Sequence, residues 1–254
     1  MVRPMQPNSK GVEMLAHFHL DGKQIPFQPG ETIMQAAMAA GVYIPHLCHN
    51  PKFTPHGSCR LCTVRLNGRP VAACTTPALA ESEVENSSEA LQQDRRTLLQ
   101  MLFVEGNHLC PGCEKSGNCQ LQAVAYFCGM LAPELTHLYP QHRLDASHPD
   151  VVLEPNRCIL CALCVRASEE SDGKGVFGMR GRGLGQYLAV NSTTGRLADS
   201  ELHHQDRAVE VCPVGAILPK HKGFEIPIGE RLYDQKPISV VGDLADHRQA
   251  QGER

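Results

Sequence analysis

The sequence of 254 residues contains no tryptophan, and aromatic residues make up only 5% of it. Large aromatic side chains contribute much of the packing energy of an ordinary apolar core. We therefore expect other bonds, such as those between a metal and its ligands, to supply part of the stability. The sequence also lacks a run of about 18 apolar residues, the length that a membrane-spanning helix needs. No membrane span is expected.

A strong charge of either sign is absent too, because 24 basic and 27 acidic residues leave a net charge of only -3. Nucleic-acid binding usually needs a marked excess of positive charge, so we do not expect it. Residues 1–10 are polar and lack the apolar stretch and small-residue cleavage site of a signal peptide. We expect a cytoplasmic protein, in which cysteines stay reduced.

Motifs for catalysis are also missing, since the sequence has neither a Walker loop nor a Rossmann unit. Four closely spaced glycines do not follow the G-x-G-x-x-G spacing, and no strand-to-helix context surrounds them. They are Gly178, Gly181, Gly183 and Gly185. We interpret residues 173–188 as a turn-rich loop and predict that the chain has no catalytic residue of its own.

Cysteine, by contrast, is abundant: the twelve cysteines fall into three groups, with one left over. In a reducing compartment, repeated Cys-x-x-Cys spacings indicate metal or redox chemistry more often than disulfides. Each group has the spacing of a ligand set for an iron-sulfur cluster. The first set is Cys48, Cys59, Cys62 and Cys74; the second is His108, Cys110, Cys113 and Cys119; the third is Cys158, Cys161, Cys164 and Cys212.

The third set has the most specific pattern. Two consecutive x2 spacings join Cys158, Cys161 and Cys164, and the distant Cys212 is followed by Pro213. This is the bacterial ferredoxin arrangement, in which the last ligand precedes a proline. A two-cluster ferredoxin would need another cysteine triplet before Cys212, and none is present. We predict a single 4Fe-4S cluster here.

The second set has only three cysteines, which leaves one corner of a 4Fe-4S cluster without a thiolate. Neutral imidazole binds iron well, and His108 stands two positions before Cys110. We predict that His108 is the fourth ligand. The alternatives are that His108 lies behind the ligands, or that the site holds a three-iron cluster or bound solvent. The remaining cysteine, Cys128, shares the apolar face of a predicted helix, and we expect it in the core.

The first set supplies four thiolates, which suffice for a 2Fe-2S cluster. Its spacing, C-x10-C-x2-C-x11-C, differs from the plant-type C-x4-C-x2-C run. A Rieske centre would use two histidines, but the complete cysteine set makes imidazole ligands unnecessary. We therefore interpret His46, His49 and His56 as loop residues. Three basic residues beside the sets, Arg60, Lys115 and Arg157, either offset cluster charge or are solvated.

Zinc is the alternative metal, because Cys-x2-Cys pairs also build zinc-binding interaction modules. The double x2 triplet and the Cys212-Pro213 ending favour iron-sulfur chemistry instead. A zinc-binding interaction protein is therefore only a remote alternative.

Local patterns predict several helices and strands. Asp21-Gly22 is a hairpin turn signal, and Thr32 is a helix cap. An Asn86–Glu89 capping box predicts the start of a helix that stops at Gly106, and the polar stretch 81–88 marks a boundary or a short surface strand. Predicted strands are 17–20, 24–27, 63–66 and 71–74, and predicted helices are 33–40, 86–105, 120–130 and 200–211, the last capped by Ser200.

Residues 18–74 resemble the 2Fe-2S ferredoxin domain of the β-grasp type that opens the large iron-sulfur subunits of complex I and related hydrogenase subunits. The second set resembles their module with one histidine and three cysteines, in which the histidine stands four positions before the first cysteine. Gly106 occupies that position here. The whole series, over roughly residues 18–218, resembles the diaphorase small subunits of soluble NAD-reducing [NiFe] hydrogenases, as does the tail from Gly223 to Tyr233.

This resemblance implies an α+β chain with a β-grasp 2Fe-2S domain, a small helical 4Fe-4S domain with mixed His/Cys ligands, and a ferredoxin-like domain with one 4Fe-4S cluster. The expected bounds are 1–15 (tail), 16–85, 86–150, 151–222 and 223–254 (tail). The stretch 240–254 is either a mobile end or a docking arm.

The resemblance also implies a non-catalytic subunit that relays single electrons. It would hold one 2Fe-2S and two 4Fe-4S clusters. FMN and NAD would lie on a flavoprotein subunit, and the NiFe centre on partner small and large hydrogenase subunits. The alternative is an electron-transfer subunit of a complex I-like or NAD-dependent formate dehydrogenase complex.

Overall fold

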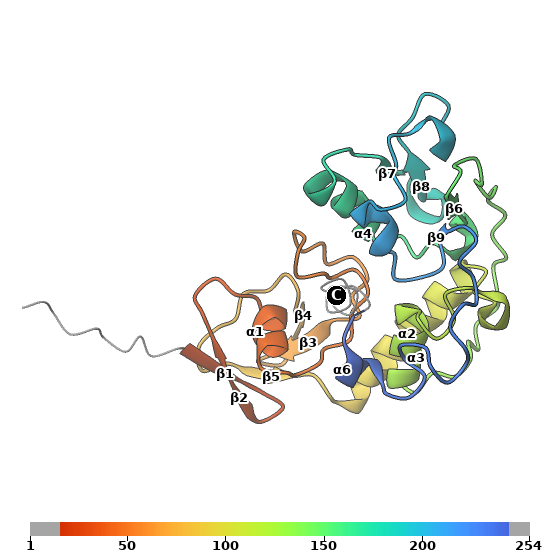
Figure 1. The fold of residues 1–254 in the computed structure, drawn as a ribbon. Coiled ribbons are helices and arrows are strands. Elements are labelled where there is room, and N and C mark those ends of the chain that lie inside the picture. The colour runs from red at the N-terminus through yellow and green to blue at the C-terminus, as the bar shows by residue number, and fades with distance from the viewer. Residues whose placement is uncertain (1–15, 244–254) are drawn as a thin grey trace, which may run out of the picture.

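The computed structural model describes residues 16–243, and the α+β fold expected from the sequence is confirmed. We refer to the predicted ranges 16–85, 86–150 and 151–222 as the first, second and third modules. The first contains a sheet with a covering helix, the second longer helices, and the third small sheets with short helices (Figure 1). Among the described residues, no helix is long and apolar enough to cross a membrane. The predicted N-terminal tail, 1–15, lies outside the described residues.

The first module is a five-stranded sheet in the order β2-β1-β5-β3-β4. Its strands are β1 (Ala16–Leu20), β2 (Lys23–Phe27), β3 (Thr63–Leu66), β4 (Arg69–Ala72) and β5 (Glu83–Glu85). Asp21 and Gly22 both have positive φ, 49° and 78°, as the predicted hairpin turn requires. The polar stretch 81–88, predicted as a boundary or a short surface strand, contains strand β5. This strand lies between β1 and β3 inside the sheet, and its Val84 is buried.

Helix α1 (Ile33–Ala39) covers this sheet and starts where predicted. The backbone N–H of Gln35 donates to the Thr32 hydroxyl over 3.2 Å, and the N–H of Thr32 donates to the Gln35 side chain over 2.8 Å. This reciprocal capping box satisfies two backbone groups that the first turn leaves free. Its apolar face packs with the sheet into a core of its own.

The second module contains α2 (Glu89–Glu105), a single 3-10 turn (Cys110–Gly112) and α3 (Gln120–Phe127). The predicted Asn86 cap is wrong, because Ser88 precedes the helix and the Asn86 side chain instead accepts a hydrogen bond from Arg95 at 2.7 Å. Helix α3 ends earlier than predicted, before Gly129 with φ 75°. Cys128 is only 3% exposed, so its predicted place in the core is confirmed.

The third module pairs β6 (Val151–Leu153) with β9 (Ile217–Pro219), and β7 (Phe177–Arg180) with β8 (Tyr187–Val190). The predicted glycine-rich loop is therefore in part a hairpin, and two of the four glycines, Gly181 and Gly183, have positive φ at its tip. Helix α4 (Leu163–Arg166) continues as a π-type turn through Ser171, and 3-10 turns form at Pro155–Arg157, Gly183–Gly185 and Leu197–Asp199.

The helix predicted over 200–211 is wrong in most of its length, because α5 spans only Arg207–Glu210. The Ser200 hydroxyl donates to the carbonyl of Leu197 at 2.8 Å instead of capping a helix. The cap comes from a distant residue: the Asp172 carboxylate accepts from the backbone N–H groups of Arg207 and Ala208 at 2.9 and 3.0 Å.

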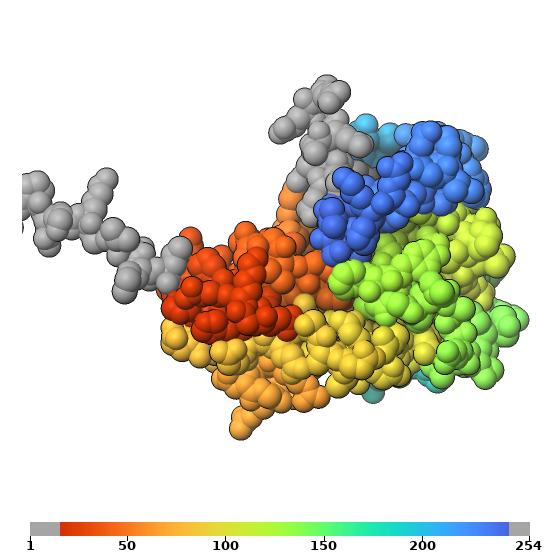
Figure 2. All heavy atoms as spheres, turned by 90° about the horizontal axis from the view of Figure 1, so that it is seen from below, coloured from red at the N-terminus to blue at the C-terminus, as the bar shows by residue number. Residues whose placement is uncertain are grey.

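The C-terminal segment returns to the first module, and Figure 2 shows this blue segment against both the first and the second modules. It carries α6 (Ile238–Val241), whose Ile238 is fully buried. Asp243 lies 2.8 Å from Nε2 of His46, and both side chains are buried. Burial lowers the pKa of His46, but the charge and hydrogen bond of Asp243 outweigh it and raise the pKa to about 9. Residues 240–243 are therefore docked, and 244–254 lie outside the described residues.

Replacing Asp243 by alanine should loosen this docking. The change removes a charge-assisted hydrogen bond from a buried site, which is worth roughly 1.5–3 kcal/mol. Hydrogen exchange of residues 238–243 and of the His46 loop should accelerate together. Asp150→Ala is the matched control, because Asp150 faces His204 in an exposed pair at 3.8 Å, and exposed pairs contribute little. Equal effects of the two substitutions would contradict the expectation.

Candidate metal centres

The first cysteine set lies where the loop after α1 meets the ends of β3 and β4. The Sγ atoms of Cys62 and Cys74 are 3.4 Å apart, and the backbone N–H of Cys59 points to Sγ of Cys48 at 3.5 Å. The four thiols therefore form two neighbouring pairs. A hydrogen bond from Cys59 lowers the pKa of Cys48 to about 5, and one from Cys62 lowers the pKa of Cys74. Each pair thus favours one thiolate, the form that binds metal.

The histidines near this set are loop residues, as predicted, but two of them are not solvated. His46 and His49 are 4% and 3% exposed, and their rings meet edge to face at 5.5 Å. His56 is exposed, as is Arg60, whose charge is therefore well screened.

The second set surrounds a small cavity. His108, Cys110, Cys113 and Cys119 all line it. Cys110 opens the 3-10 turn, and Cys119 directly precedes α3. Arg157 also lines this cavity and pairs with Glu114 at 2.9 Å, although it adjoins Cys158 of the third set in sequence.

The imidazole of His108 has the properties of a metal ligand. Its Nε2 atom is buried and has no hydrogen-bond partner among the described residues. Burial, with a smaller effect from Arg157, lowers the pKa of His108 to about 4, so the ring is neutral. A Cβ on Gly106 would lie 2.4 Å from Nε2. Gly106 stands four positions before Cys110. Because it has no side chain, the imidazole of His108 can lie directly against it.

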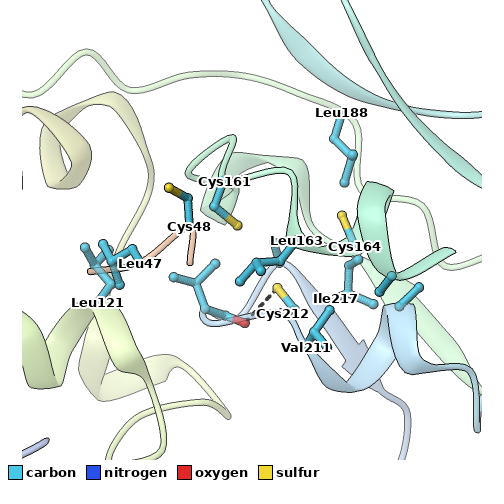
Figure 3. Packing of buried hydrophobic residues seen from close by; sticks show 14 of the residues in the cluster. Leu47, Cys48, Leu121, Cys161, Leu163, Cys164, Leu188, Val211, Cys212 and Ile217 are labelled. Carbon is cyan, nitrogen blue, oxygen red and sulfur yellow. Dashed lines mark hydrogen bonds between the residues drawn. The ribbon is translucent and has the colours of Figure 1, made fainter. Parts of the chain in front are cut away.

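The third set surrounds another small cavity, whose walls are otherwise apolar. Cys158, Cys161, Cys164 and Cys212 line it. Figure 3 shows the last three of these around a common space, with Leu188 and Ile217 nearby. Leu160 and Ala162 have positive φ, 52° and 55°, which winds the triplet tightly. A positive φ is energetically unfavourable for residues other than glycine. The surrounding structure must therefore hold Leu160 and Ala162 in this conformation.

Burial governs the protonation of the third set. Loss of solvent raises the pKa of Cys158 to about 12, and it also raises the pKa values of Cys161 and Cys164. Without metal these thiols stay protonated at neutral pH. Metal binding therefore has to release the protons, so loading is coupled to pH.

The side chains of the three sets are not gathered around single points in the described structure. Among residues 16–243, no group of three or more His, Cys, Asp or Glu side chains is arranged to hold one ion. The cysteines of the second and third sets instead line the walls of cavities. Zn²⁺ needs its four ligands about 2.0–2.3 Å from one point, whereas a polynuclear cluster spreads them apart. The donor sets fit an iron-sulfur cluster better than zinc.

The third set adjoins both the first and the second, although it comes last in the sequence. One guanidinium nitrogen of Arg166 contacts the carbonyl oxygens of both Cys48 and Cys161, so the first and third sets are neighbours. Gly215, just after the last cysteine of the third set, lies against Cys113 of the second. Sequence reasoning could not find these contacts, because they join residues far apart in the chain.

Substituting Gly215 by alanine should damage the second site. The added Cβ would lie 2.7 Å from Sγ of Cys113, so the thiol would have to move. Iron bound at the second site should fall or its spectrum should change. Gly185→Ala is the control, because its Cβ would meet nothing within 4 Å. Iron and sulfide analysis with electron paramagnetic resonance (EPR) checks this; an unaltered second site in the Gly215 variant would contradict it.

Three family models match successive parts of the chain. Residues 14–89 match a 2Fe-2S iron-sulfur cluster binding domain. Residues 95–133 match the NADH-ubiquinone oxidoreductase-G iron-sulfur binding region. Residues 151–218 match a 4Fe-4S single cluster domain.

Similar proteins include the NAD-reducing hydrogenase HoxS subunit gamma of Cupriavidus necator, 37% identical over 86% of this chain and 93% of the relative. The NADPH-Fe(3+) oxidoreductase subunit alpha of Geobacter sulfurreducens is 32% identical over 79% of this chain, but only 24% of its own length is covered. A crystal structure of an NAD+-reducing [NiFe]-hydrogenase in the H2-reduced state contains a chain with 54% identity and a TM-score of 0.87, with 90% of this chain and 97% of that one covered.

Proposed function

The chain belongs to the family of iron-sulfur subunits of NAD-reducing [NiFe] hydrogenases, and we propose that it relays single electrons between the hydrogen-splitting and NAD-reducing parts of such a complex. The observation that supports this best is that the third donor set adjoins both the first and the second within one folded chain. Iron-sulfur clusters take up and release one electron at a time. The chain itself carries no catalytic residue in this proposal.

The proposed ligands are the twelve residues named from the sequence. Cys48, Cys59, Cys62 and Cys74 would hold one 2Fe-2S cluster; His108, Cys110, Cys113 and Cys119 one 4Fe-4S cluster; and Cys158, Cys161, Cys164 and Cys212 another. The orphaned Nε2 of His108 and the cavity that it shares with three thiols support the mixed set. The module bounds 16–85, 86–150 and 151–222 are part of the same proposal.

The surrounding residues would keep water away and set the local charge. Apolar walls around the third set, including Met179 and Leu188, exclude solvent, and low polarity disfavours the more negative, reduced state. At the second set, the neutral imidazole of His108 replaces one thiolate, which makes the site less negative and raises its reduction potential. Arg157 at the same cavity acts in the same direction.

The proposed partners follow from the family. A flavoprotein subunit would carry FMN and NAD, and the small and large hydrogenase subunits would carry the NiFe centre. The complex would be cytoplasmic. The second candidate is a complex I-like or NAD-dependent formate dehydrogenase complex; one such relative is the NADH dehydrogenase [ubiquinone] iron-sulfur protein 1 of Solanum tuberosum, 30% identical, but this chain spans only 28% of it.

The direct test is to purify the tagged chain with its native partners without oxygen and assay hydrogen-dependent NAD+ reduction. Activity with nickel and flavin present is the expected result, together with iron and acid-labile sulfide of about ten each per copy of the chain. Recovery of a formate-oxidising or quinone-reducing partner would show that the chain serves as the electron-transfer subunit of a different complex. Zinc without sulfide would reject the proposal.

His108→Ala should alter the EPR spectrum of one 4Fe-4S cluster and leave the other two clusters unchanged. His108→Cys restores a fourth ligand but adds one negative charge, so it should lower the potential of that cluster. His137→Ala is the control, because His137 is the neighbouring histidine whose Nδ1 is also buried without a partner among the described residues. An effect of the His137 change alone would reassign the ligand.

A further inference from the structure

Arg166 is a buried cation whose hydrogen bonds all go to backbone carbonyl oxygens. It ends helix α4 and is 8% exposed. Its Nη1 donates to the carbonyl of Thr54 at 2.7 Å, and its Nε donates to that of Ala162 at 3.3 Å. Its Nη2 contacts the carbonyls of Cys48 and Cys161 at 2.5 and 3.5 Å.

These contacts join two modules that are far apart in sequence. Ala162 and Cys161 belong to the third module, whereas Cys48 and Thr54 belong to the loop that carries the first cysteine set. The guanidinium also lies 6.0 Å from the centre of the Phe53 ring, close enough for a cation–π contact. The rigid planar fork of arginine can hold several acceptors in fixed positions. Arg166 thus fastens the two ligand loops to each other.

Among residues 16–243 the guanidinium of Arg166 forms no direct ion pair, because its hydrogen bonds go to carbonyl oxygens and it packs near one aromatic ring. The nearest acidic group in this network is Glu170, whose carboxylate accepts from the backbone N–H of Thr54 at 3.0 Å and not from Arg166. Arginine does not lose its proton in proteins. Burying a charge without compensation is strongly unfavourable. The chemistry that would balance it is the negative charge of the thiolates and sulfides at the adjoining Cys48 and Cys161.

We propose that Arg166 is a shared positioning residue of the first and third metal centres, which fixes the spacing of their ligand loops and raises the reduction potentials of both. The inference rests on the proposed ligand sets. A fixed positive charge stabilises the reduced, more negative state of a nearby cluster, so its removal lowers the potential. One side chain then keeps two neighbouring carriers matched, because any change in it moves both in the same direction.

Arg95 is the matched comparison. It is also buried, at 1% exposed, and donates to carbonyls of the first set's surroundings, those of Leu61 and Thr63, at 3.1 and 3.0 Å. Its charge acts on Cys62 of the first set and on the non-ligand Cys128. Its hydrogen bonds within residues 16–243 reach Leu61, Thr63 and Asn86, none of which belongs to the third set. Arg95 therefore tests whether an effect on both clusters is specific to Arg166.

The experiment is an EPR-monitored redox titration of the purified complex carrying Arg166→Gln or Arg95→Gln. Arg166→Gln should lower the reduction potentials of the 2Fe-2S cluster and of the third-set 4Fe-4S cluster. The reduction potential of the second-set 4Fe-4S cluster should stay unchanged. Arg95→Gln should lower only the 2Fe-2S potential. Unmoved potentials in an iron-replete Arg166→Gln complex would overturn the charge role, and an equal shift of all three clusters would show general damage instead.

Arg166→Lys covers the case in which the glutamine variant does not assemble. Lysine keeps the charge but cannot reach the same set of carbonyls. Hydrogen exchange should then accelerate in residues 48–54 and 161–166 together, while the segment 108–119 stays protected. Acceleration in one loop alone would overturn the bridging role. If the wild-type complex shows no cluster signals, the proposed function itself is rejected. If the wild-type signals are normal and the cluster potentials of the Arg166 variants equal those of the wild type, only the role of Arg166 is rejected.

Discussion

Removal of the iron-sulfur clusters should unfold most of the chain, with the first module the most resistant part. Structural metal sites contribute about 10–16 kcal/mol in small zinc domains, which is comparable to the whole stability of a typical domain, 5–15 kcal/mol. The second and third sets line cavities in the large core that they share with Leu121 and Leu163. Without metal, these cavities lose the bonds that span them.

The first module differs because its sheet and α1 have a separate apolar core, built around Phe18, Ile25 and Ile33. Its sheet should therefore retain some protection from hydrogen exchange. For a chain of this size, about 10 kcal/mol corresponds to a fall in Tm of more than roughly 20 °C, since 1 kcal/mol shifts it by about 2–4 °C.

The measurement is anaerobic oxidation and chelation, followed by circular dichroism and hydrogen exchange. Loss of protection over residues 86–222, with partial protection over 16–85, is the expected pattern. A single cooperative transition with nearly the Tm of the loaded protein would show that the apolar cores suffice.

Cys212→Ala should stop electron transfer through the subunit, whereas Cys128→Ala should leave it intact. Cys212 lines the cavity of the third set, and that set adjoins both other sets. Loss of that ligand should empty or alter this site, so electrons would have to cross from the first set to the second without an intermediate carrier. Hydrogen-dependent NAD+ reduction should fall to the level seen without the subunit.

Cys128 is the matched control because it is equally buried, belongs to the same core, and lines neither of the two cavities. Burial raises its pKa to about 11, as for an inert thiol. The Cys212 variant should keep its 2Fe-2S EPR signal, which separates loss of one site from misfolding. Loss of a cluster in the Cys128 variant, or near-normal transfer in the Cys212 variant, would contradict the arrangement.

The sequence predicts well what short-range chemistry decides. The cap at Thr32 and the turn at Asp21-Gly22 depend only on neighbours, and both form as expected; the reciprocal bond from Gln35 that completes a capping box at Thr32 was not predicted. The cysteine spacings likewise predict which donors lie around the second and third cavities. The ligation itself stays a prediction until iron is measured in the variants.

Long-range contacts account for what the sequence could not predict. Ser200 looks like a helix cap, but the cap of α5 comes from Asp172. The sequence also predicts Asn86 as a helix cap, but its side chain accepts a hydrogen bond from the buried Arg95 instead. The neighbouring positions of the first and third sets depend on Arg166, whose partners lie more than a hundred residues away. No local pattern marks such a residue.

The pairing of His46 with Asp243 has a consequence for how the protein is made. The loop that carries Cys48 is held by a residue near the other end of the described chain. During synthesis this latch is absent until the ribosome has added Asp243 and released enough chain for it to fold back. The loop that carries Cys48 therefore lacks this contact until then, and a chain terminated before Asp243 would never form it.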